Sequence, residues 1–189
     1  MRLRLPAGAD VTLHRVRPDD WRAHRDLRLE MLQDAPDAYW TQYADVVDLD
    51  EAAWRSRIAA QHHLHAHADG HPVGSVGLFP DPDEAPDTLT LVAMYVPPRA
   101  RGRGVGERLV QAVLDEAVAR GCGRVVLEVT SGNDPALALY ERMGFRLTGR
   151  SAPHPRRADL LELSMERDLT GGSRPSETRI PPGAPDVEG

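Results

Sequence analysis

The sequence lacks several features, and each absence excludes a class of protein. Its 189 residues include no lysine, so it cannot carry the phosphate-binding P-loop motif G-x-x-x-x-G-K-[ST]. A lone cysteine, Cys122, excludes an intrachain disulfide. No apolar run approaches the roughly 18 residues of a membrane-spanning helix. The N-terminal segment has no apolar stretch before Pro6 and Gly8, so we expect no signal peptide.

Positive charge is also scarce, because the formal net charge is −6 at pH 7. This balance argues against a general binder of nucleic acid or anionic membranes, since both partners attract a basic surface. Hydrophobic residues make up 41% and charged residues 28%, as in an ordinary globular protein of one domain. We therefore expect a soluble, cytoplasmic protein with no nucleic-acid or membrane partner.

Hydrophobic periodicity predicts one α/β domain over residues 1–169. Apolar residues four positions apart, such as Leu27 and Met31, indicate helices, and Asp69-Gly70 indicates a tight hairpin turn between two strands. A long antiparallel run followed by strand–helix–strand units indicates a mixed sheet. The predicted strands are 11–17, 63–69, 72–79, 89–96, 124–129, 145–150 and 158–167. The predicted helices are 19–33, 50–61, 105 to the cap Gly121, and 135–143.

Residues 170–189 differ in composition from the rest of the chain. They contain four prolines, and Ile180 and Val187 are their only sizeable apolar side chains. So little apolar surface does not offset the entropy of ordering a chain. We predict a disordered tail that the domain does not need.

The stretch PPRARGRGVGERLV (97–110) places three glycines at alternate positions among arginines. Gly102, Gly104 and Gly106 let a ligand approach the backbone, and a helix that begins near Gly104 exposes unpaired N–H groups. This combination favours an anion, phosphate above all. A dinucleotide-binding fingerprint fits less well, because its spacing is G-x-G-x-x-G and it stands early in a βαβ unit. An arginine-rich, solvated turn is the simplest alternative.

Two blocks of sequence resemble a known family. Arg101-x-x-Gly104-x-Gly106, after MYVPPRA, resembles the R/Q-x-x-G-x-G/A motif of the GNAT superfamily of N-acyltransferases. LEVTSGNDPALALYERMGF (127–145) resembles the strand and helix that follow in that family, and the likeness covers about 11–168. It implies a single GNAT-like domain with a mixed, mostly antiparallel twisted sheet of about seven strands and about four flanking helices. It also implies that the anion is the pyrophosphate of acetyl-CoA.

The resemblance further implies which residues hold acetyl-CoA. The strand at 94–96 would hydrogen-bond the pantetheine arm and polarise the thioester carbonyl through its main-chain N–H groups. Pro97 and Pro98 suit a strand that ends abruptly, since neither donates a backbone hydrogen bond. Asn133 would contact the cofactor, although its position also suits a helix cap. The implied cofactor-binding residues are Met94, Tyr95, Val96, Arg101, Gly102, Arg103, Gly104, Val105, Gly106 and Asn133.

Tyr140 and Glu128 are the catalytic candidates. The resemblance implies that Tyr140 protonates the departing thiolate, and the alternative is an aromatic on a buried helix stripe beside Leu137. Glu128 lies within VVLEV, where a charge needs a cleft or a partner. It resembles the glutamate base of the GNAT branch that acetylates N-terminal amines of ribosomal proteins. The alternative is an acidic residue on the solvated face of a strand.

The acceptor side is predicted from DAPDAYWTQYADVVD (34–48), which combines aspartates with aromatic residues where GNAT enzymes receive their amine. Acid beside aromatic suits a cationic amine, so Tyr39 and Trp40 are the substrate candidates. The alternative is a capped surface loop. We expect transfer of the acetyl group of acetyl-CoA to a primary amine, on a small molecule or a peptide, by direct attack in a ternary complex. A non-catalytic acyl-CoA-binding module is the alternative, and a homodimer is left open.

Five histidines between positions 62 and 71 raise the question of a metal site. His63, His65 and His67 alternate with Leu64 and Ala66, the pattern of a half-exposed strand. No cysteine or acidic residue completes a recognisable ligand set. We therefore predict no metal.

Overall fold

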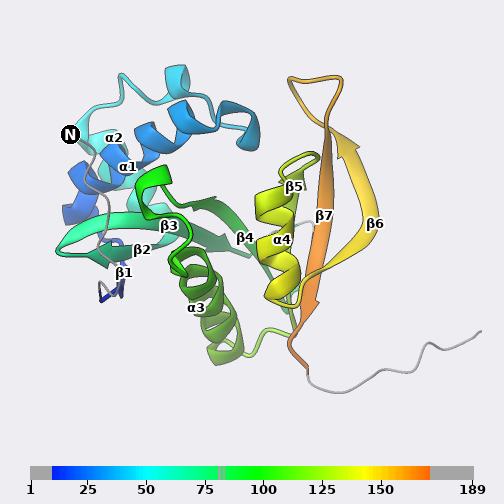
Figure 1. Ribbon diagram of the computed structural model, residues 1–189. Coiled ribbons are helices and arrows are strands. Elements are labelled where there is room, and N and C mark those ends of the chain that lie inside the picture. The colour runs from blue at the N-terminus through cyan, green and yellow to red at the C-terminus, as the bar shows by residue number, and fades with distance from the viewer. Residues whose placement is uncertain (1–9, 81, 83, 171–189) are drawn as a thin grey trace, which may run out of the picture.

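The computed structural model describes residues 10–80, 82 and 84–170, which build a seven-stranded sheet with helices on both faces (Figure 1). The strand order is β1-β2-β3-β4-β5-β7-β6, and neighbours are antiparallel except for the parallel pair β4–β5. The predicted α/β fold is confirmed. The strands are β1 (Thr12–Arg15), β2 (His62–Ala68), β3 (His71–Phe79), β4 (Thr88–Tyr95), β5 (Arg124–Thr130), β6 (Arg146–Pro153) and β7 (Leu161–Asp168). The α-helices in the described ranges are α1 (Trp21–Asp34), α2 (Glu51–Ala60), α3 (Val105–Ala119) and α4 (Asp134–Arg142), with 3₁₀ turns at Pro18–Asp20, Pro36–Ala38, Tyr43–Asp45 and Pro98–Ala100.

Local signals in the sequence explain several boundaries. Asp69 and Gly70 both have positive φ, 52° and 76°, as the predicted tight turn between β2 and β3 requires. Gly121, at φ 73°, follows the end of α3. The Asp50 side chain accepts a hydrogen bond from the Ala53 amide (2.8 Å) and caps α2.

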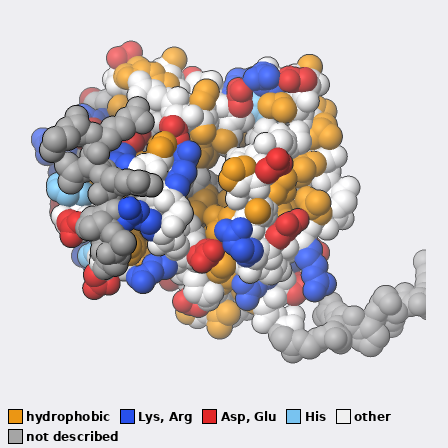
Figure 2. Space-filling model, in the orientation of Figure 1, with side chains coloured by type: hydrophobic (Ala, Val, Ile, Leu, Met, Phe, Trp, Pro, Cys, Tyr) orange, Lys and Arg blue, Asp and Glu red, His pale blue; other side chains and the backbone are white. Residues whose placement is uncertain are grey.

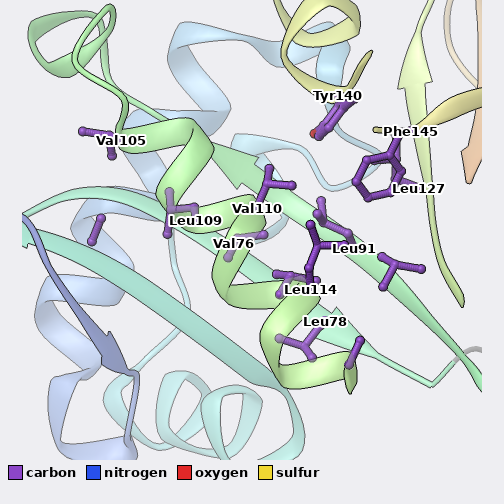
Figure 3. Close-up of a cluster of buried hydrophobic side chains, with 14 of the residues drawn as sticks. Val76, Leu78, Leu91, Val105, Leu109, Val110, Leu114, Leu127, Tyr140 and Phe145 are labelled. Carbon is purple, nitrogen blue, oxygen red and sulfur yellow. The ribbon is translucent and has the colours of Figure 1, made fainter. Parts of the chain in front are cut away.

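The main hydrophobic core lies between α3 and the sheet (Figure 3). Val76 and Leu78 of β3 belong to it, together with Leu109, which is fully buried. Gly74 permits this packing, because a Cβ there would lie 2.9 Å from Cδ1 of Leu109. Truncating a buried leucine costs about 2–5 kcal/mol, so α3 is held firmly against β3 and its N-terminus is fixed in place.

The sheet opens between its two parallel strands. Pairing of β4 with β5 runs from Thr88 opposite Arg124 to Thr90 opposite Val126 and goes no further along the described strands. On its other edge β4 contains a bulge, since Ser75 pairs with Tyr95 but Gly77 pairs with Val92. Ala93, at the bulge, has φ 51°. Figure 2 shows the molecule hollowed between the half built on β1–β4 and the half built on β5–β7.

The prediction of a half-exposed histidine face on β2 is wrong. His63 and His65 are buried, at 7% and 2% exposure, because the face that carries them lies under α1. His24 of α1 stacks with the His65 ring at 5.3 Å between centroids, and its Nδ1 lies 3.1 Å from Nε2 of His65. His67 alone of the three is part-exposed.

Two further predictions concern the whole chain. No helix among the described residues combines the length and the apolar composition that crossing a membrane requires. The predicted tail lies outside the described residues from Gly171 onward, so its disorder stays a prediction.

Candidate active site

A cleft of about 1000 Å³ follows the opening between β4 and β5. Residues from α1, α2, α4 and strands β2 to β7 line it, so its walls come from both faces of the sheet. Six of the predicted site residues are among its walls, namely Tyr39, Trp40, Met94, Glu128, Asn133 and Tyr140. The cleft lining does not include Tyr95, Val96 or the loop 101–106.

The glycine loop lies at the start of α3. Gly102 and Gly104 have φ of 72° and 73°, and a Cβ at either would meet no atom within 4 Å. No side chain caps Gly104, so the first N–H groups of α3 are left for another partner. Gly106 joins the loop to the cleft, because a Cβ there would lie 3.0 Å from Leu139 and 3.4 Å from Met94. An open helix N-terminus with space above it suits an anion such as a pyrophosphate.

The two arginines of this loop have different surroundings. Arg101 donates from Nε to the Val96 carbonyl (2.9 Å) and forms an ion pair with Asp34. Its side chain therefore ties the end of β4 and the end of α1 to the loop. Nη1 of Arg103 is buried and has no hydrogen-bond partner within the described part of the chain. Of the two side chains, Arg103 is therefore the less fully paired.

Tyr140 lies at the core side of the cleft. Its side chain is 5% exposed, and its ring meets that of Phe145 edge to face at 5.8 Å (Figure 3). Burial, and then the neighbouring Tyr39, raises the pKa of Tyr140 above its ordinary value. The phenol is therefore protonated at neutral pH and holds a proton that it can donate. Asn133 caps the helix that carries Tyr140, accepting from the Ala136 amide at 3.4 Å.

Glu128 points to the opposite face of the sheet. Leu127 and Val129 pack into the core with Tyr140, and alternation along a strand directs Glu128 away from them. The carboxylate side chain is exposed and lines the cleft on the face that α1 and α2 cover. A candidate base and a candidate acid thus lie on opposite faces, at the point where the sheet is open.

Tyr39 and Trp40 form part of the acceptor-side wall. The Tyr39 hydroxyl donates to the Met94 carbonyl (2.7 Å), which ties this segment to β4 just after its bulge. Burial is the largest cause of a raised pKa of Tyr39, so this donor stays protonated. The Trp40 side chain is 66% exposed.

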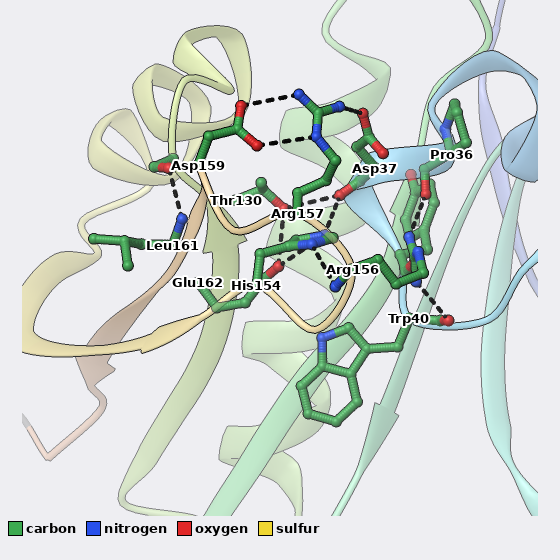
Figure 4. Close-up of polar contacts among 12 residues, drawn as sticks. Pro36, Asp37, Trp40, Thr130, His154, Arg156, Arg157, Asp159, Leu161 and Glu162 are labelled. Atoms are coloured by element: carbon green, nitrogen blue, oxygen red, sulfur yellow. Dashed lines mark hydrogen bonds and ion pairs between the residues drawn. The ribbon is translucent and has the colours of Figure 1, made fainter.

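The loop between β6 and β7 holds this segment in place (Figure 4). Arg156 donates to the main-chain carbonyls of Pro36 (2.8 Å), Tyr39 (2.8 Å) and Trp40 (2.9 Å). Nε2 of His154 lies 2.9 Å from the Asp37 carbonyl oxygen. The acceptor-side wall is therefore built by contacts between distant parts of the sequence, which the motifs did not reveal.

The predicted cluster of carboxylates around the aromatic residues is not formed in the cleft. Asp34 pairs with Arg101, Asp37 pairs with Arg157 (2.6 Å), and Asp45 accepts from the Gln42 amide (2.7 Å). These three and Asp48 are absent from the residues that line the cleft. The aspartates of this segment therefore do not draw a cationic acceptor into the cleft.

Sequence reasoning missed four residues on the α1–α2 face of the cleft. His24, Arg28, Arg57 and His63 line it. Burial lowers the pKa of His24 to about 2 and that of His63 to about 4, with neighbouring histidine and arginine charges adding to the effect. These imidazoles are neutral at pH 7. A signal was present, because Arg28 stands three positions before Met31, and helix residues three apart are neighbours on one face.

A metal site has no support in the described ranges. They contain no group of three or more histidine, cysteine, aspartate or glutamate side chains able to hold an ion together.

Comparison with known proteins gives consistent matches. The model of the acetyltransferase (GNAT) family matches residues 21–145. N-alpha-acetyltransferase RimI of Mycobacterium tuberculosis is 35% identical over 119 residues, 62% of this chain and 73% of that protein. A streptothricin acetyltransferase of Streptomyces lavendulae is 44% identical over 61 residues, 32% of each chain, so the match spans about a third of that relative. The structure of yncA from Salmonella typhimurium with its cofactor acetyl-CoA has a TM-score of 0.70 at 20% identity, covering 89% of this chain and 99% of that one.

These matches, with the open sheet and the uncapped helix, define the class of the protein as an acyl-CoA-dependent acetyltransferase. The chain belongs to the GNAT family. The predicted family and enzyme class are confirmed.

Proposed function

We propose that this protein transfers the acetyl group of acetyl-CoA to a primary amine by direct attack, with both substrates bound together in the cleft. One observation carries the proposal. Glu128 and Tyr140 line the same cleft from opposite faces of the sheet, at the place where β4 and β5 separate. An amine can then approach from one face while the thiol departs from the other.

The cofactor side suits a coenzyme A with its pyrophosphate at the start of α3. The uncapped N-terminus and the open space above Gly102 and Gly104 both fit an anion. Acetyl-CoA supplies the activated thioester. The bulge at Ala93 turns the backbone of β4 just before Met94, Tyr95 and Val96, whose main-chain N–H groups are the candidates to hold the pantetheine arm and polarise the carbonyl.

The chemistry requires two proton movements. Glu128 accepts a proton from the amine, directly or through water, as the nitrogen–carbon bond forms. Tyr140 donates its phenolic proton to the sulfur as the carbon–sulfur bond breaks. Burial raises the pKa of Tyr140, but it also disfavours a thiolate in the same cleft, which keeps the proton transfer accessible.

The names of the relatives support an amine acceptor. One is named an N-alpha-acetyltransferase and the other a streptothricin acetyltransferase, so proteins similar to this one are named for different acceptors. Asn133 contributes by capping α4 and so setting the position of Tyr140.

A panel of amines tests the proposal. The panel contains amino acids, amino acid amides, polyamines, aminoglycosides and short peptides, each assayed for thiol release that depends on acetyl-CoA. Mass spectrometry should find one acetyl group on the accepted amine. Tight acetyl-CoA binding without thiol release for any amine would overturn the transferase proposal and indicate an acyl-CoA-binding module instead.

A further inference from the structure

Two arginines on the α1–α2 face of the cleft have no acidic partner among the described residues. Arg28 extends from α1 and Arg57 from α2. Neither takes part in any ion pair formed among the described residues. Other arginines on the same two helices are paired: Arg25 contacts Asp26, and Arg55 contacts both Asp19 and Glu51. Among the described residues these two arginines therefore have no ion-pair partner, and Glu128 is the acidic residue of the cleft that lies on the same face.

The surroundings of Arg28 make this charge costly. Its side chain is half-buried, and its polar contacts are a weak one from Nη1 to the Met31 sulfur (3.4 Å) and the Tyr39 ring, 5.8 Å from the guanidinium carbon. Burial, and the like charge of Arg57, lowers the pKa of Arg28, although an arginine stays charged in proteins. The neighbouring His24 and His63 are neutral, and an imidazole has no anionic form at this pH that could balance an arginine.

Two acidic side chains of the cleft are committed elsewhere. Glu84 pairs with Arg150 (3.2 Å) and also lies 3.7 Å from Arg124. Glu162 accepts from the Thr130 hydroxyl (3.2 Å) and lies 3.5 Å from Nε2 of His154. Glu84, from the loop between β3 and β4, and Glu162, from β7, both contact side chains of the β5–β7 half, and their charges are not among those that act on Arg28.

Arg28 lies close to the proposed reaction centre. Its guanidinium neighbours the Tyr39 ring, and the Tyr39 hydroxyl is bonded to the Met94 carbonyl after the bulge of β4. Arg28 and Arg57 also lie on the face of the sheet to which Glu128 points. An acceptor whose amine is next to Glu128 would therefore extend its remaining groups toward the two arginines.

We propose that Arg28 and Arg57 bind a carboxylate on the acceptor, so that the substrate class is an amine that also carries a carboxylate, such as an amino acid. This inference rests on the proposed transferase function. A guanidinium holds a planar carboxylate through two parallel hydrogen bonds, and a part-buried site strengthens them. The aspartate-rich segment suggested a positively charged acceptor. This proposal instead places a negatively charged group on the acceptor, because arginines and not those aspartates face the cleft.

Matched acceptor pairs test the proposal. Alanine, leucine and phenylalanine are each assayed as the free amino acid and as the carboxamide, which differ in the carboxylate. We expect kcat/KM to favour at least one free acid over its amide by tenfold or more. Arg28→Gln and the exposed Arg57→Gln should each lower that ratio several-fold, and Arg28→Lys should retain part of it. Arg22→Gln, an exposed change on the outer side of α1, serves as the control and should leave the ratio unchanged.

A binding measurement separates the possible failures. Calorimetry with N-acetyl-phenylalanine and its amide needs no turnover, and the acid should bind more tightly to the wild type but not to Arg28→Gln. The carboxylate site would be overturned if every amide reacted as fast as its free acid or faster. It would also be overturned if the preference for the acid persisted in both arginine variants. Neither result would contradict the transferase function. Absence of acetyl transfer would count against the proposed function. Calorimetry would then test the carboxylate site alone, and equal binding of the acid and the amide would overturn that site.

Discussion

The two sides of the cleft are built in different ways. The cofactor side depends on backbone shape within short stretches of sequence: two glycines with positive φ, an uncapped helix start and a bulge at Ala93. The acceptor side depends on side chains that reach across the fold, such as Arg156, which bonds the Tyr39 carbonyl from 117 positions away. Local sequence therefore reports the class of reaction, whereas the acceptor is set by contacts that only the folded chain brings together.

The largest effect should come from breaking the backbone geometry of the cofactor side. Gly104→Val places a branched side chain where the pyrophosphate is proposed to bind, at a backbone φ of 73°. Loss of two hydrogen bonds to a charged group, at about 2 kcal/mol each, would weaken acetyl-CoA binding about 1000-fold in calorimetry. Gly70→Val is a matched control, because Gly70 has φ 76° and equally open space but lies in the β2–β3 turn. Equal losses in both variants would show that backbone strain, not the anion site, explains the effect.

The next effect should come from the proton donor. Tyr140→Phe removes one hydroxyl and should lower kcat about 100-fold while the KM for acetyl-CoA stays nearly constant, because the proton is needed only in the transition state. Tyr43→Phe, away from the cleft lining, is the control. Wild-type turnover in Tyr140→Phe would mean that the ring only packs against Phe145.

Acid should lower the free energy of unfolding through the buried histidines of the acceptor side. Burial lowers the pKa of His24, His63 and His65 to about 2, 4 and 3, below the unfolded value of 6.5, so the fold favours the neutral form. The resulting stability is complete above pH 6.5 and is lost as the pH falls toward the folded pKa values. At pH 5 one such histidine has lost about 2 kcal/mol of its contribution. Urea unfolding from pH 8 to 5 should show this decline, and His24→Asn should make it shallower; a flat profile would contradict the buried stack.

A smaller effect is expected at the contact between the acceptor-side segment and the β6–β7 loop. Arg156→Ala removes three hydrogen bonds to the carbonyls of Pro36, Tyr39 and Trp40. Their combined loss should loosen the wall and lower kcat/KM for the amine about tenfold, with acetyl-CoA affinity unchanged. Arg146→Ala, on an exposed part of β6, is the comparison variant. A fall in acetyl-CoA affinity of the same size would show that the two sides are not separable.

The fold was largely predictable, because helix and strand periods and the Asp69-Gly70 turn are local. The glycine loop was predictable for the same reason. The bulge at Ala93 was not, since an alanine gives no sign of a positive φ. The burial of His63 and His65 was missed because alternation shows that a strand has two faces but not which helix covers each. Arg28 was missed because its lack of an acidic partner among the described residues is a property of the folded chain.

Hydrogen–deuterium exchange with and without acetyl-CoA tests the division of the cleft most directly. Acetyl-CoA should slow exchange of the amides at 94–96 and 102–107, where backbone groups are proposed to hold the pantetheine arm and the pyrophosphate. Exchange at 36–40 and 154–160 should change little until an acceptor is added. Acetyl-CoA binding that leaves 94–96 and 102–107 unprotected would contradict the account of the cofactor side.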